Sequence, residues 1–307
     1  MQQGWIWLTV LAALMQAVRT AAQKVLAERI STMSATYVRA LLGLPVMLVY
    51  LAVVTGFPAH ALPPVGWDFL GSCLVAAATQ NLGTAALLHL YKLRNFAVAN
   101  QLARTNLVFT AVLGSAFFSE VISPLGWVAI GLTLSGAVAL TFERQGLGLA
   151  HARAGSWRDL CDWPSVRTGL FIGLMFGVCN LAIREATLSL HTDDALVRGA
   201  VTVTTVTVLQ VASLGLWLVF REPGFIAGIR DNLALSSFVG LTSAFGSIGW
   251  FAAFAMTNAS YVMAVGQIEV VFGLLISVLY FKERLTNLDF VGIAIVVSGI
   301  MLFRMAA

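Results

Sequence analysis

The sequence has little charge for its length. Asp, Glu, Lys and Arg make up only 10 % of its 307 residues, whereas soluble globular chains contain about 25 %. Apolar residues make up 59 %, and the mean hydropathy is +0.88. A soluble chain of this length cannot bury so much apolar surface in one core. These proportions exclude a soluble enzyme and a disordered chain, and they indicate a membrane protein.

The chain is also poor in the residues and motifs that carry catalysis or bind metals. Its three cysteines, Cys73, Cys161 and Cys179, are far apart, and its four histidines are scattered. This spacing favours neither a disulfide framework nor a metal site. No HExxH, Walker A or GxGxxG motif occurs in a suitable context, and no loop carries a dense Lys/Arg run for binding phosphates. We therefore expect no catalytic residue, metal, cofactor or nucleic-acid partner, and we predict that the chain is not an enzyme.

Apolar residues occur instead in blocks of about twenty, the length that a helix needs to cross the hydrocarbon layer. Lipid offers no hydrogen-bond partner to the backbone, so these blocks are expected to be helical. We predict an all-α membrane protein with ten transmembrane helices. Their approximate ranges are 4–23, 35–56, 66–90, 95–118, 124–142, 166–189, 195–220, 235–257, 260–281 and 287–304.

The two halves of the chain resemble one another. A shift of 163 residues superposes Phe109 on Phe272, Glu120 on Glu283 and Ser135-Gly136 on Ser298-Gly299. These matches fall in order and in the same block of each half, although chance similarity between apolar helices is the alternative. We predict a first repeat of five helices over 1–142, a polar linker over 143–165 and a second repeat of five helices over 166–307.

Loop charges predict that the repeats are inverted, as an odd number of crossings requires. The loop after the first block contains Lys24 and Arg29, whereas the equivalent loop of the second half contains Asp193 and Asp194 and no Lys or Arg. The other equivalent loops differ in the same way. Lys and Arg gather in cytoplasmic loops. We therefore expect a multi-pass protein of the cell inner (plasma) membrane, with a cytoplasmic linker and both termini outside.

Two ionisable residues fall near the middle of equivalent blocks, Arg104 in the fourth and Glu269 in the ninth. Charges inside a membrane are costly, so each is a candidate functional residue. Three interpretations are open. The pair can neutralise itself; it can bind a zwitterion, with Arg104 on the carboxylate and Glu269 on the ammonium; or Glu269 can take up and release a proton.

Further polar and aromatic residues predict a hydrated cavity around this pair, with interhelical hydrogen bonding as the alternative for each amide. Trp250 and Tyr261 are expected to flank the substrate. Arg39 and Arg198 begin their predicted helices, and we expect them to reach the interface or cap a neighbouring helix. The expected polar neighbours are Gln16, Arg19, Gln80, Asn81, Gln101, Asn106, Asn180, Arg184 and Gln267.

The end of the second half resembles a known family. The stretches Gln267–Phe272 and Phe281–Thr286, followed by Gly292 and Ser298-Gly299-Ile300, are similar to the end of an EamA repeat in the drug/metabolite transporter superfamily. The first half keeps Glu120 of the Glu-Arg pair, but Val121 replaces the arginine. The resemblance covers both repeats. It implies a ten-helix carrier that moves small metabolites through a central cavity between the repeats.

Together these observations predict a secondary transporter, expected to export, that works by alternating access at a midplane cavity. Its substrate is expected to be a small polar metabolite, with an amino-acid-like zwitterion favoured and proton coupling through Glu269 left open. One alternative is a transporter of organic cations or drugs, held by Glu269 and Trp250. Another is a non-transporting structural or sensor subunit. The expected partners are the substrate and the lipid bilayer, and ten helices suffice for a monomer.

Overall fold

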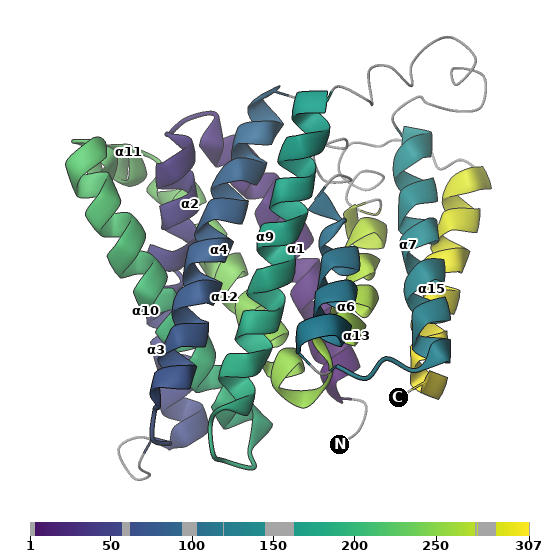
Figure 1. Ribbon diagram of the computed structural model, residues 1–307. Helices are drawn as coiled ribbons and strands as arrows, with labels where there is room; N and C mark the ends of the chain where they lie inside the picture. The colour runs from purple at the N-terminus through teal and green to yellow at the C-terminus, as the bar shows by residue number, and fades with distance from the viewer. Residues whose placement is uncertain are drawn as a thin grey trace.

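The computed structural model describes residues 4–56, 62–93, 103–118, 120–144, 163–273, 275 and 287–306. Every regular element in these ranges is a helix, and the helices form one bundle (Figure 1). The helices are α1 (Gly4–Ala27), α2 (Thr32–Leu41), α3 (Leu44–Thr55), α4 (Trp67–Leu93), α6 (Asn106–Phe117), α7 (Pro124–Arg144), α9 (Trp163–Leu188), α10 (Ala195–Arg221), α11 (Phe225–Asp231), α12 (Leu233–Met256), α13 (Ala259–Val265), the 3₁₀ turn η2 (Gly266–Ile268) and α15 (Asn287–Ala306).

Six helical stretches are long and apolar enough to cross a membrane, which confirms an all-helical, multi-pass protein in the part of the chain that is described. They coincide with the first three predicted spans of each half. Shorter apolar helices lie where the remaining four spans are expected. The count of ten stays a prediction, because residues 94–102 and 276–286 lie outside the described ranges. Which face is cytoplasmic and whether the chain is a monomer also stay predictions.

Helices of the two halves pack in matching pairs. α1 packs on α12 and α4 packs on α9, so the first helix of each half contacts the third span of the other. α7 and α15, which end the two halves, lie side by side (Figure 1). In the same view α1 starts at the end of the bundle where both termini lie, whereas α9 starts at the opposite end. This arrangement is a two-fold repeat architecture with the two copies oppositely directed.

Small residues bring these pairs close together, because a missing side chain lets two helix backbones approach. A Cβ atom on Gly249 of α12 would lie 2.8 Å from the carbonyl oxygen of Leu8 in α1. A Cβ atom on Gly136 of α7 would lie 2.8 Å from the backbone nitrogen of Val296 in α15. Both pairs therefore depend on glycine at the contact.

The second predicted span is divided into two helices. α2 ends at Leu41 and α3 begins at Leu44, with Pro45 in its first turn. Proline has no N–H, so the helical hydrogen bond to the carbonyl of Leu41 cannot form. Gly43 fills the break, and a Cβ atom there would lie 3.2 Å from the carbonyl oxygen of Gly240 in α12. The break therefore lets α12 pack closely on the chain between α2 and α3.

Candidate functional site

A cavity of about 110 Å³ lies between helices of both repeats. It receives side chains from α1, α2, α4 and α6 of the first repeat, and from α9, α12, α13 and the segment after α13 in the second. Its lining combines arginines, amides and aromatic rings. The lining residues are Gln16, Arg19, Thr20, Arg39, Gln80, Thr84, Leu87, Ala103, Arg104, Asn106, Phe176, Cys179, Asn180, Ile183, Ser247, Trp250, Phe251, Phe254, Met263, Gly266, Gln267 and Glu269.

Glu269 is held in the cavity by a glutamine of the other repeat. The Nε2 atom of Gln16 in α1 donates a hydrogen bond to Glu269 Oε2 at 3.0 Å. The Oε1 atom of the same glutamine accepts a hydrogen bond from the indole Nε1 of Trp250 at 3.1 Å. Both ends of the Gln16 amide are therefore used. The carboxylate, the amide and the indole form one fixed row across the interface between the repeats.

Arg104 is held in a matching way from the opposite repeat. Its terminal nitrogen donates a hydrogen bond to Gln267 Oε1 at 2.9 Å. Gln267 is buried, and its own Nε2 donates to the carbonyl of Met263 at 3.2 Å. Arg104 comes just before α6, where the described helix starts at Asn106. Each predicted charge is therefore oriented by a glutamine of the other half.

The two charged groups do not form an ion pair with each other in the described part of the chain. The one ion pair recorded there joins Arg184 and Glu120, and it lies elsewhere. Arg104 and Glu269 line the same cavity. Because the two side chains do not contact each other directly, each keeps donors or acceptors that can bind a solute.

Arg19 and Arg39 also line the cavity. Arg39 is only 4 % exposed, and the buried Nε atoms of both arginines lack a hydrogen-bond partner among the described residues. The expectation that Arg39 reaches the interface is wrong, because α2 begins at Thr32 and Arg39 follows about two turns later. Arg198 lies in the first turn of α10, and it does cap a neighbour by donating to the carbonyl of Ala255 at 2.9 Å.

The other predicted site residues occupy several environments. Gln80 lines the cavity and accepts a hydrogen bond from Gln210 Nε2 at 2.6 Å. Asn180 also lines it and donates to Thr110 Oγ1 at 3.2 Å. Both amides therefore form hydrogen bonds between helices, as buried amides in membrane proteins do. They also line the cavity, and contact with a solute stays a prediction.

Four predicted residues are not among the lining residues of the cavity, and one of them, Arg184, is instead paired with Glu120. Asn81 is not among its lining residues, because it follows Gln80 on α4 and successive helical residues point in different directions. Tyr261 is also absent from the lining; its hydroxyl accepts a hydrogen bond from the backbone N–H of Ser123 at 3.3 Å, toward the start of α7. Gln101 lies outside the described residues.

Sequence reasoning missed several lining residues. Thr20 and Thr84 each lie one helical turn after a predicted amide, Gln16 and Gln80, so the four-residue spacing could have found them. Phe254 stacks on Trp250 with ring centroids 6.1 Å apart, also at a spacing of four. No comparable signal marks Phe176 or Met263, because apolar side chains are common at every position of these helices.

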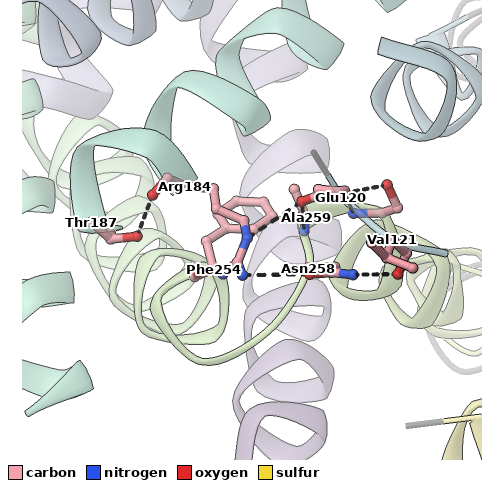
Figure 2. Close-up of polar contacts among 8 residues, drawn as sticks. Glu120, Val121, Arg184, Thr187, Phe254, Asn258 and Ala259 are labelled. Atoms are coloured by element: carbon pink, nitrogen blue, oxygen red, sulfur yellow. Dashed lines mark hydrogen bonds and ion pairs between the residues drawn. The ribbon is translucent and has the colours of Figure 1, made fainter. Parts of the chain in front are cut away.

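A second buried polar cluster lies where α6, α9 and α12 end and α13 begins (Figure 2). Glu120 accepts hydrogen bonds from the backbone N–H of Ala259 at 2.6 Å and from the hydroxyl of Ser260 at 2.7 Å. Arg184 Nε lies 3.4 Å from Glu120 Oε1, and another guanidinium nitrogen donates to the carbonyl of Phe254 at 2.7 Å. This cluster ties the end of α6 in the first repeat to three helices of the second.

Apolar helices in two related halves, with a polar cavity between them, define the class as a multi-pass membrane protein. The sequence model of the EamA-like transporter family matches residues 3–142 and 168–305. The chain therefore belongs to the EamA-like transporter family, in the drug/metabolite transporter superfamily, and is a membrane transporter of small solutes.

Comparison with solved proteins agrees at the level of the fold. The fold matches 26 chains of solved structures. One of them, titled only as a crystal structure of a protein, has a TM-score of 0.71 and 14 % sequence identity, and the match covers 100 % of this chain and 98 % of that chain. At this identity the likeness concerns the fold alone. No curated protein matches the sequence.

Proposed function

We propose that the protein carries a small zwitterion, such as an amino acid, by alternating access at the cavity between the repeats. One observation supports this proposal above the others. Arg104 and Glu269 come from equivalent segments of the two repeats, line one cavity, and are each oriented by a glutamine of the opposite repeat. Carriers built from inverted repeats bind their substrates at this kind of interface.

The two charges match the two ends of an amino acid. The guanidinium of Arg104 is a planar fork that can donate two parallel hydrogen bonds to a carboxylate. The free oxygen of Glu269 can accept from an ammonium while Gln16 holds the other oxygen. Both side chains are half-buried, and a charge-assisted hydrogen bond is stronger there than in bulk water. The same carboxylate can hold a proton when the ammonium leaves, which would couple transport to protons.

The size and charge of the cavity disfavour organic cations and drugs. Sites for drug-sized ligands enclose about 300–1,000 Å³, whereas this cavity encloses about 110 Å³. Its described lining contains three arginines and one carboxylate. A cation would therefore meet more repulsion than attraction from these charges. Its main favourable contact would be the ring face of Trp250, whose indole N–H is bonded to Gln16.

Alternating access requires the bundle to open at each end in turn, and the cluster around Glu120 lies where α6, α9 and α12 end and α13 begins. It joins the two repeats by an ion pair and by hydrogen bonds to the start of α13. We infer that it closes this end in the present conformation and separates when the other conformation forms. We propose export as the direction of transport. The direction that is observed depends on the gradient to which transport is coupled.

Transport assays in proteoliposomes test the function. We expect uptake of a labelled amino acid by the unaltered protein, and a fall of about tenfold or more for Arg104→Gln and for Glu269→Gln, since each loses a charge-assisted contact. Arg167→Gln is the matched control, because Arg167 is exposed near the start of α9. An unchanged rate and pH dependence for Glu269→Gln would disprove the role of this carboxylate. Failure to move any amino acid would overturn the proposed substrate class.

A further inference from the structure

The cavity contains more positive charge than a zwitterion can use. Arg19, Arg39 and Arg104 line it together with a single carboxylate, Glu269, among the residues that the structure describes. Arginine stays protonated in proteins, so these four side chains leave an excess of two positive charges. A zwitterion has no net charge and would leave that excess unchanged. Uncompensated charge inside a membrane protein is costly and is typical of a functional site.

Arg19 and Arg39 are not neutralised by the protein around them. Neither forms an ion pair with a carboxylate within the described ranges, and the buried Nε atom of each has no hydrogen-bond partner there. Arg39 is 4 % exposed, so bulk water does not solvate it. Two guanidinium groups with unused donors, both facing one cavity, form a site for an anion.

The order of the charges along the cavity narrows the class of anion. Gln16, which binds Glu269, lies three residues before Arg19 on α1, and Gln267, which binds Arg104, lies two residues before Glu269. Arg39 lines the same cavity from α2. Glu269 is therefore connected to the Arg104 side of the cavity through Gln267 and to the Arg19 side through Gln16, and Arg39 adds a further positive group to the same lining. A complementary solute has one ammonium and two acidic groups, with the ammonium near Glu269.

We propose that the substrate is an acidic amino acid, an amino dicarboxylate whose second carboxylate binds Arg19 and Arg39. The proposal rests on the function proposed above, in which Arg104 and Glu269 bind the α-carboxylate and the ammonium. The present proposal adds a role for Arg19 and Arg39, which have no partner on a solute with a single carboxylate. The excess positive charge of the described lining then falls from two to one, and Arg19 and Arg39 share the second carboxylate.

A pair of ligands of nearly equal size tests the proposal. L-Aspartate and L-asparagine differ by a carboxylate in place of an amide. Isothermal titration calorimetry on the purified full-length protein should show L-aspartate binding at least about tenfold more tightly, because a charge-assisted contact is gained. Arg39→Gln and Arg19→Gln should each reduce this preference, because each should weaken the binding of L-aspartate more than that of L-asparagine. Arg39→Lys should keep part of the preference, and Arg167→Gln should keep all of it.

The outcomes separate this proposal from the function on which it rests. Equal binding of L-aspartate and L-asparagine to the unaltered protein would overturn the second acidic group and leave the zwitterion carrier intact. Binding of succinate as tight as that of L-aspartate would support the acidic subsite but overturn the role of Glu269 toward the ammonium. If Arg39→Gln fails to fold in a thermal unfolding assay, the ligand pair on the unaltered protein and on Arg19→Gln still decides the matter.

Discussion

Removing the charge of Glu120 should destabilise the protein more than removing the charge of its partner Arg184. Glu120 is 6 % exposed, accepts hydrogen bonds from the backbone N–H groups of Ala259 and Ser260 and from the Ser260 hydroxyl, and is paired with Arg184. Breaking a buried ion pair by removing one partner costs about 3–5 kcal/mol, because the remaining charge is uncompensated. We therefore expect Glu120→Gln to lower the free energy of unfolding by about 3–5 kcal/mol.

Arg184→Gln should cost less. It leaves a carboxylate that still accepts three hydrogen bonds, so the penalty should be about 1.5–3 kcal/mol, the value of one charge-assisted bond. In the double variant the unpaired guanidinium is absent as well. Its total loss should therefore be clearly smaller than the sum of the two single losses.

Unfolding in mixed micelles with increasing sodium dodecyl sulfate, followed by circular dichroism, measures these free energies. Glu28→Gln serves as the control, because Glu28 is exposed just after α1 and should change the free energy by no more than about 0.5 kcal/mol. If the losses of Glu120→Gln and Arg184→Gln add to within about 0.5 kcal/mol in the double variant, the two side chains do not interact. That result would refute the account of this cluster.

Two further predictions concern helix packing and conformational change. Gly249→Ala should destabilise the protein by about 1–3 kcal/mol in the same assay, because its Cβ would lie 2.8 Å from the carbonyl of Leu8, whereas Gly71→Ala, with nothing within 4 Å, should not. Asn258 Nδ2 donates to the carbonyl of Val121 at 3.2 Å, so a short thiol cross-linker between Val121→Cys and Asn258→Cys should stop transport in proteoliposomes. Transport at the unlinked rate after complete cross-linking would show that this end need not open, and each single-cysteine variant is the control.

The sequence was most informative about properties that depend on the residues of a single helix. The length of the apolar blocks predicted the helices, because an isolated segment must satisfy its own backbone in lipid. The rarity of charge inside these blocks identified Arg104 and Glu269, and both line the cavity. The four-residue spacing from Gln16 and Gln80 could also have identified Thr20 and Thr84, which line the cavity one turn later. Each of these inferences needs the residues of one segment alone.

The sequence was least informative where the answer depends on how a helix is placed. Arg39 and Arg198 are equivalent in the sequence, because each lies near the start of the second apolar block of its half. In the structure α2 starts well before Arg39, which carries this arginine into the cavity, whereas Arg198 stays in the first turn of α10 and caps α12. Tyr261 shows the same limit, because its direction toward Ser123 is set by the packing of α13 on α7.

The sequence alone therefore determined a helical membrane protein with a charged interior, because those properties follow from the cost of exposing backbone and charge to lipid. Matching residues at a fixed shift and the loop charges added the two related halves. The tertiary structure decided which charges meet. It brought Gln16 to Glu269 and Gln267 to Arg104 across the two repeats, and it placed Arg19 and Arg39 in the same cavity. Contacts between residues more than a hundred positions apart depend on the packing of whole helices, which no local pattern encodes.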